Sequence, residues 1–193
     1  MNRKILSSLS LFLIGFLTFS SSVWCGEMQT ITLGGKPLTL MGEKLQTGKM
    51  LPTVLLPDLG LNMVDLQSFK GKVTLLSVVL SLDTPTCDKQ THILSEENKG
   101  LDKIANLITI SRDLPFAQKR FATKTKMQNI TFLSDYRDAQ FGKSTGLLIE
   151  ENRLLARAII ILDPEGTVRY LEIVSELSKL PDMEKAMEFA RSL

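Results

Sequence analysis

The sequence predicts an α/β domain in which helices flank a central mixed β-sheet. Residues 72–80 (KVTLLSVVL) form a continuous β-branched and aliphatic run, which indicates a strand buried on both faces. Strand-like and helical segments then alternate along the chain, as they do in helix-covered sheets. Residues 154–163 and 167–174 are joined by the turn sequence DPEG, which predicts an antiparallel hairpin. Parallel and antiparallel pairs together make the expected sheet mixed.

The other elements follow in chain order. Gly34-Gly35 lies inside the alternating residues 29–40, which predicts an N-terminal β-hairpin. A looser segment, punctuated by Gly48, Pro52 and Pro57, continues to Gly71. We then expect a helix at about 85–99, a strand at 105–111, a short helix at 115–123, a strand near 130–133, a helix near 138–145 and an amphipathic helix from Pro181.

Residues 1–26 are typical of a secretory leader, which leaves residues 27–193 as one folded domain. Arg3 and Lys4 precede an almost wholly apolar run, residues 5–19, and three serines follow it. The apolar run is shorter than the ~20 residues that span a membrane, although a retained anchor is the alternative. We therefore expect an exported, periplasmic protein.

Cys25 lies at the end of this leader, where it is either removed, retained as a free thiol or lipid-modified. Trp24 fits a lipoprotein signal poorly, because a small residue is expected before the modified cysteine. We expect membrane association only if Cys25 is lipidated.

The charge balance argues against a nucleic-acid partner. The chain has 23 basic and 21 acidic residues, and the leader carries two of the basic ones. The mature domain is therefore formally neutral, without the basic excess that phosphate binding needs.

Cys87 is the one cysteine of the predicted domain, and a lone cysteine is usually only a small buried apolar residue. Here Thr84-Pro85 predicts a helix start, because threonine is a good N-cap and proline is favoured at the first helical position. Cys87 then falls in the first turn, where the free N–H groups and the helix dipole favour a thiolate. This position suits a nucleophile.

Two other cysteine chemistries are disfavoured. The segment Thr84-Pro85-Thr86-Cys87 lacks the first thiol of a C-x-x-C pair, so thioredoxin-type disulfide exchange is not available. His92 is the only histidine and no metal-ligand spacing occurs, so we expect no metal or cofactor. A Cys87–His92 dyad is also disfavoured, because a residue five positions on lies off the cysteine's helix face.

Seven segments resemble the bacterial thiol peroxidases, a thioredoxin-fold branch of the peroxiredoxins. They occur in the family's order from about residue 31 to the C-terminus: ITLGGKPLTL, FKGKVTLLSVV, SLDTPTCD, DLPFAQKRF, LSDYRDAQFG, LLARA and PDMEKAMEFA. The resemblance implies a thioredoxin-like fold, with which the predicted element order is compatible. It also implies a homodimer.

The resemblance assigns roles to three residues. Cys87 matches the peroxidatic cysteine, which attacks the peroxide and becomes a sulfenic acid. Thr84 matches the threonine that hydrogen-bonds within the thiolate and peroxide site. Arg157 matches the arginine that holds the thiolate and polarises the peroxide, in keeping with a guanidinium's permanent charge and fork of donors. The alternative for Arg157 is a structural pair with a carboxylate at a strand end.

Two departures from the family pattern affect the expected mechanism. Leu80 stands where the family has a proline, four residues before the threonine. Leucine has a backbone N–H and a freer φ than proline, so the loop is less rigid and the rate of peroxide reduction is in doubt. Ala122 replaces the resolving cysteine that follows FAQ-x-RF. We therefore expect a one-cysteine mechanism, in which an external reductant, either a thioredoxin-like protein or a small thiol, reduces Cys87.

The sequence thus predicts a thiol-dependent peroxidase acting on hydrogen peroxide and alkyl hydroperoxides. The alternative is a catalytically weakened scaffold or redox sensor that acts by binding, which Leu80 and Ala122 favour. Retention of Thr84, Cys87 and Arg157 together favours the enzyme.

Overall fold

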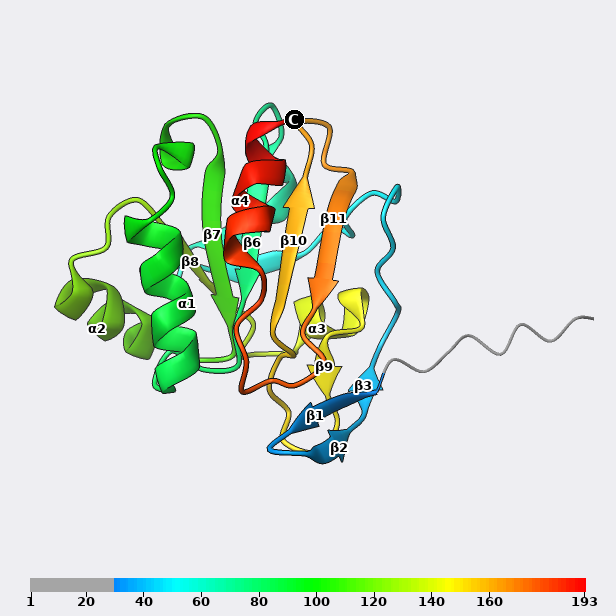
Figure 1. The fold of residues 1–193 in the computed structure, drawn as a ribbon. Coiled ribbons are helices and arrows are strands. Elements are labelled where there is room, and N and C mark those ends of the chain that lie inside the picture. Colours follow the sequence, from blue (N-terminus) through cyan, green and yellow to red (C-terminus); the bar gives the residue numbers. More distant parts are fainter. Residues whose placement is uncertain (1–29) are drawn as a thin grey trace, which may run out of the picture.

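The computed structural model describes residues 30–193, so the predicted leader and Cys25 lie outside the described residues. A five-stranded sheet forms its centre, in the order β11-β10-β6-β7-β8 (Figure 1). The central strands β6, β7 and β8 are parallel, whereas β10 runs antiparallel to β6 and β11 antiparallel to β10. This confirms the mixed sheet. The strand bounds are β6 Thr74–Val78, β7 Asn106–Ser111, β8 Thr131–Ser134, β10 Ala158–Leu162 and β11 Val168–Ile173.

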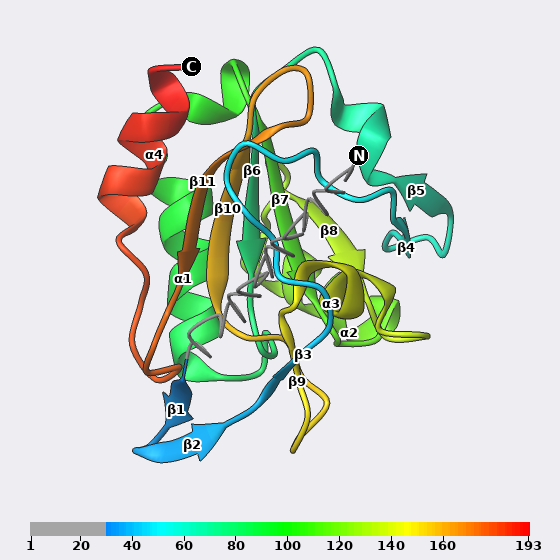
Figure 2. The same ribbon diagram turned by 90° about the vertical axis from the view of Figure 1, so that its right-hand side faces the viewer.

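Helices cover both faces of this sheet. Figures 1 and 2 show α1 and α4 on one face and α3 on the other. Figure 1 shows α2 beside α1 near the β8 edge, where Phe121 of α2 contacts His92 of α1. Both α1 and α2 begin at a proline, which fits the first helical position because its missing N–H needs no partner there. The helix bounds are α1 Pro85–Glu96, α2 Pro115–Thr125, α3 Gln140–Thr145 and α4 Met183–Arg191, with short 3₁₀ helices η1 at Leu66–Phe69 and η2 at Leu101–Lys103. No helix within residues 30–193 is long and apolar enough to cross a membrane.

Three small strand pairs surround the sheet. The predicted N-terminal hairpin is present as β1 (Ile31–Leu33) and β2 (Lys36–Leu38). Its turn needs glycine, because Gly34 and Gly35 both adopt positive φ. The other pairs are β3 with β9 (Leu40–Met41 and Leu148–Ile149) and β4 with β5 (Leu55–Pro57 and Met63–Asp65). The sequence did not predict them, because two or three residues are too few to show an alternating pattern.

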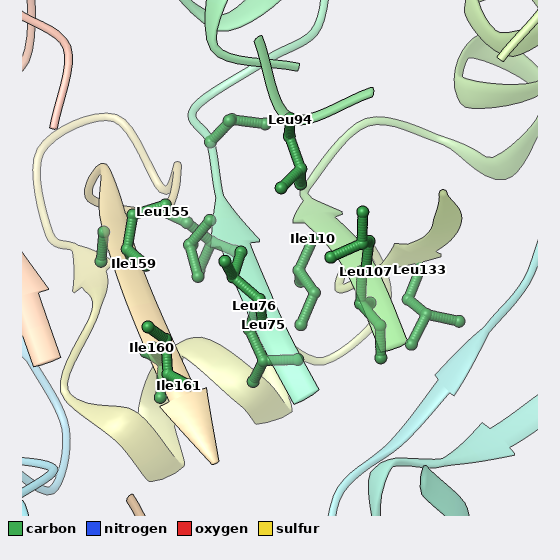
Figure 3. Packing of buried hydrophobic residues seen from close by; sticks show 14 of the residues in the cluster. Leu75, Leu76, Leu94, Leu107, Ile110, Leu133, Leu155, Ile159, Ile160 and Ile161 are labelled. Carbon is green, nitrogen blue, oxygen red and sulfur yellow. The ribbon is translucent and has the colours of Figure 1, made fainter. Parts of the chain in front are cut away.

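The core lies on both faces of the central strands. Every residue of β6 and β10 is buried, as their continuous apolar runs predicted. Figure 3 shows Leu75 and Leu76 of β6 among Ile159, Ile160 and Ile161 of β10, and Leu94 of α1 packs in the same cluster.

One predicted boundary was wrong, and it affects the site. The strand predicted at 154–163 begins only at Ala158. Before that, the Ala156 N–H donates to the Leu147 carbonyl at 2.8 Å, so this segment runs beside the end of β9 rather than along β6. Arg157 therefore lies in the connection just before β10.

Glu176 joins the N-terminal hairpin to the loop between β11 and α4. Its carboxylate accepts hydrogen bonds from the backbone N–H groups of Gly34 and Gly35, from the Thr32 hydroxyl, and from the Ser178 N–H and hydroxyl. The bonds from Ser178, followed by those from Thr32 and the two glycines, hold the pKa of Glu176 far below the ordinary value of 4.5. The charged carboxylate is thus the form that the fold stabilises.

Glu176→Gln should destabilise the protein at neutral pH, with a difference that shrinks on acidification. Because the folded pKa is depressed, the contribution of Glu176 is fully present above pH 4.5 and is lost as the pH falls toward the folded value. Thermal unfolding of both proteins over a pH series measures this. Glu188→Gln, an exposed change on α4, is the control. A pH-independent difference between Glu176→Gln and the parent would contradict the assignment.

Candidate active site

Cys87 lies in the first turn of α1 and is completely buried. The helix begins at Pro85 after the extended Thr84, as Thr84-Pro85 predicted. The buried residues Cys87, Gln90, Thr91 and Leu94 recur at helical spacing, so they form the face of α1 that is turned into the protein. The thiol is therefore inside the protein beside the start of the helix.

Arg157 contacts the thiol directly. Its Nη2 donates to Cys87 Sγ at 3.4 Å, its Nη1 to Gln90 Oε1 at 2.7 Å, and its Nε to the Leu177 carbonyl at 3.0 Å. The side chain is only 2% exposed. Within residues 30–193 no carboxylate forms an ion pair with it. The alternative in which Arg157 pairs with a carboxylate at a strand end is therefore wrong.

This arrangement places the sulfur of Cys87 beside a buried positive charge. A guanidinium stays protonated in proteins, and a buried charge is costly unless an opposite charge compensates it. Of the three groups that Arg157 contacts, an amide and a carbonyl are neutral, and only the thiol can ionise. Cys87 as a thiolate would complete an ion pair at the start of a helix, where the dipole has the same preference.

The sheet topology explains why Cys87 and Arg157 meet. The chain leaves the carboxyl end of β6 to enter α1, so Cys87 lies at that edge of the sheet. Strand β10 is antiparallel to β6, with Ala158 opposite Val78, so β10 starts at the same edge. Arg157, one residue before β10, therefore lies beside the first turn of α1, although 70 positions separate it from Cys87.

Thr84 is placed beside the site but not in contact with the sulfur. It is exposed, and its hydroxyl donates to the Ser81 carbonyl at 2.9 Å. Its side chain neither caps α1 nor makes a hydrogen bond to Cys87. The expected hydrogen bond within the thiolate site is thus absent from this structure, because the hydroxyl closes the tight turn of residues 81–84 instead.

The sequence reasoning missed Gln90. Its side-chain oxygen Oε1 accepts a hydrogen bond from Arg157 Nη1, and its side-chain Nε2 donates to the Ser77 hydroxyl of β6 at 2.8 Å. It is fully buried. Gln90 thus fixes the guanidinium from the side opposite to Leu177. Its spacing of three residues from Cys87 was the available signal, since such residues share a helix face.

Asp113 was also missed as a residue that holds the loop before α1. Its carboxylate accepts from the Ser81 hydroxyl at 2.7 Å, the Leu82 N–H at 2.8 Å and the Ser111 hydroxyl at 2.8 Å. Parallel pairing of β6 and β7 brings the carboxyl ends of both strands, and hence Ser81 and Asp113, to one edge. Asp113 therefore supports the turn from which Thr84 and Cys87 follow.

The two departures from the family pattern are both buried. Leu80, at the proline position, is 5% exposed and belongs to the apolar core. Ala122, at the resolving position, is 7% exposed on the inner face of α2. Cys87 is the only free cysteine among residues 30–193.

Comparison with known proteins identifies the family. The Redoxin family model matches residues 46–187. A thiol peroxidase from Staphylococcus saprophyticus is 43% identical over 86% of this chain and 100% of its own length, and one from Halalkalibacterium halodurans is 46% identical over 86% and 99%. The chain belongs to the thiol peroxidase family. A solved peroxiredoxin-like protein from Aquifex aeolicus superposes with a TM-score of 0.80 at 34% identity, covering 85% of this chain and 96% of its own.

These matches confirm the family resemblance and the thioredoxin-like fold. A solved thiol peroxidase from Chromobacterium violaceum has a TM-score of 0.73 at 26% identity, over 84% of this chain and 95% of its own.

Asp113→Asn should slow peroxide oxidation of Cys87 by up to about 100-fold, since small displacements of a reacting group are costly. It should also lower the free energy of unfolding by about 1.5–3 kcal/mol, the range for hydrogen bonds to a charged group. Stopped-flow oxidation and urea unfolding measure the two effects.

The matched control is Asp163→Asn, which removes a carboxylate that accepts from the N–H groups of Glu165 and Thr167 in the β10–β11 turn. This turn lies at the opposite sheet edge, so stability should fall without a change in rate. Equal oxidation rates in Asp113→Asn and the parent would show that Asp113 is only structural.

Proposed function

We propose that this protein is a thiol-dependent peroxidase in which Cys87 reduces hydrogen peroxide and alkyl hydroperoxides. One observation carries the proposal: within residues 30–193, the buried guanidinium of Arg157 contacts a lone thiol and no carboxylate. A guanidinium in this place can stabilise both a thiolate and the charge that develops on a peroxide oxygen. The names of the similar proteins support the same activity.

In the proposed reaction the Cys87 thiolate attacks one peroxide oxygen. An S–O bond forms as the O–O bond breaks, and the leaving hydroxide or alkoxide takes a proton, giving water or an alcohol and a sulfenic acid on Cys87. The Nη2 group of Arg157 stabilises the charge that moves from sulfur to oxygen. For Thr84 we propose that its hydroxyl turns from the Ser81 carbonyl to the bound peroxide.

The return to the thiol is proposed to need an external reductant. Ala122 stands at the resolving position, so Cys87 has no partner for an intramolecular disulfide within residues 30–193. A homodimer also remains our proposal from the family resemblance. Leu114 and Phe116, exposed at 51% and 58% near the start of α2, are apolar side chains that such an interface could cover.

Arg157→Gln should slow Cys87 oxidation by about 100-fold or more, the usual effect of removing a donor to a developing oxyanion. It should also reduce the thiolate absorbance at neutral pH. Stopped-flow mixing with hydrogen peroxide, followed by intact mass, measures the reaction. The expected product has gained one oxygen on Cys87, without the loss of two hydrogens that a disulfide would show.

Two further variants serve as controls for this experiment. Cys87→Ser should abolish oxygen uptake. Arg169→Gln, an exposed change at the Asp163 ion pair, should leave the rate unchanged. A parent rate no faster than that of a free thiol at the same pH would favour the scaffold or sensor instead.

Export is proposed from residues 1–26. The protein recovered from an expressing bacterium should lack the leader, with a new N-terminus near residue 22 or 26, and intact mass measures this. Added acyl mass in the membrane fraction would instead mean that Cys25 is lipidated. A full-length product in the cytoplasm would contradict export.

A further inference from the structure

Two cations on α2 have no partner in the described structure. Arg120 and Lys124 lie one helical turn apart and are both exposed. Neither side chain makes a hydrogen bond or ion pair with any of residues 30–193. Because residues four apart share a helix face, the two charges can act on one anionic ligand.

Both cations line a groove between α1 and α2, with a volume of about 850 Å³. The opposite wall, at the start of α1, is formed by Asp83, Thr84, Pro85 and Asp88. It therefore carries two carboxylates, of which Asp88 lies 3.5 Å from His92 Nε2. The T-shaped contact between His92 and Phe121, whose ring centroids are 6.4 Å apart, joins the two helices across the groove. The helices lie side by side in Figure 1. The groove thus places two unpaired positive charges on its α2 wall, across from Asp83 and Asp88 at the turn that carries Cys87.

We propose that this groove binds a small thiol carrying a carboxylate, and that this thiol is the reductant of Cys87. The proposal rests on the proposed peroxidase function, whose product is the sulfenic acid. Ala122, on the same helix, leaves the resolving thiol to be supplied from outside. Helix α2, which carries Ala122 at the resolving position, forms one wall of the groove. Arg120 and Lys124 of the same helix would hold the carboxylate of the small thiol.

Access to the sulfur requires the first turn of α1 to open, because Cys87 is fully buried. Three side-chain contacts hold the turn: the Thr86 hydroxyl donates to the Ser178 carbonyl at 3.2 Å, the Thr91 hydroxyl donates to the Cys87 carbonyl at 2.8 Å, and Arg157 contacts the sulfur. Helix ends open at low free-energy cost. Since Thr84 and Pro85 are the wall of the groove, opening would present the oxidised sulfur to a thiol already bound there.

The two reduction steps balance without any other reactant. The bound thiolate attacks the sulfenic sulfur, an S–S bond forms, the S–O bond breaks, and the oxygen leaves as water after protonation. This yields a mixed disulfide between Cys87 and the small thiol. A second small thiol then attacks it, releasing the disulfide of the two small thiols and the Cys87 thiol.

The test compares thiols of different charge on pre-oxidised mature protein. Cys87 is first converted to the sulfenic acid with hydrogen peroxide and then mixed with mercaptoacetate, mercaptoethanol or cysteamine. The rate of mixed-disulfide formation is followed by intact mass after acid quenching. Each rate is expressed relative to the parent's rate with the same thiol, so that the thiols' intrinsic reactivities cancel.

Arg120→Gln/Lys124→Gln should slow the reaction with mercaptoacetate by roughly three- to tenfold, the size expected for two exposed charge contacts. It should leave mercaptoethanol unaffected. Arg120→Glu/Lys124→Glu should slow mercaptoacetate further and accelerate cysteamine. High salt should remove both differences. The control Lys89→Gln/Lys119→Gln removes two exposed cations that do not line the groove and should change none of the rates.

The outcomes separate this inference from the proposed function. If peroxide adds no oxygen to Cys87, the proposed function fails and the inference with it. If the sulfenic acid forms but the groove variants react with all three thiols at the parent's rates, only the inference is overturned. The inference is also overturned if a protein dithiol no longer reduces Cys87 in the groove variants while mercaptoacetate reacts with them at the parent's rate.

Discussion

The buried positive charge of Arg157 is the constraint on which the rest of the site depends. A guanidinium that is 2% exposed and has no carboxylate partner among residues 30–193 must be compensated in another way. It makes one contact to a group that can become an anion, Cys87, and two to neutral acceptors, Gln90 and the Leu177 carbonyl. The same contact that gives the buried cation an acceptor therefore also places a positive charge beside the sulfur that we propose as the nucleophile. Burial of the guanidinium and the proposed chemistry thus depend on one hydrogen bond.

The surrounding structure supports this guanidinium from separate directions. Gln90 is fixed by Ser77 of the central strand, so the position of Nη1 is set by the core. The Leu177 carbonyl belongs to the β11–α4 loop, which Glu176 ties to the N-terminal hairpin and Ser178 ties to Thr86 of α1. The hairpin, remote from the sulfur in the chain, thus belongs to the framework that orients Arg157. A change at Glu176 would reach Cys87 through that loop.

The sequence was sufficient for the parts of the site that follow local rules. Thr84-Pro85 predicted the helix start that puts Cys87 in the first turn of α1. The sequence was insufficient where contacts between distant parts of the chain decide a residue's role. Asp113 resembles any loop aspartate until the pairing of β6 with β7 brings it to Ser81, and the Thr84 hydroxyl satisfies the Ser81 carbonyl rather than the sulfur. The β4–β5 pair is too short to be recognised from any periodic pattern.

The loop before Cys87 shows how this chain differs from the family pattern in physical terms. Proline at position 80 would restrict the backbone from within, whereas Leu80 restricts it only by packing in the core. Asp113 adds order from outside the loop, because two of its hydrogen bonds hold Ser81 and Leu82 and a third, from Ser111, fixes its carboxylate. Such a loop can be ordered in the resting structure and still open, because its hydrogen bonds can break one at a time. The restriction that a proline ring places on φ is covalent and stays in every conformation. The one-cysteine mechanism that we propose depends on such opening, because the buried sulfur of Cys87 would then have to reach a thiol that the described fold does not contain.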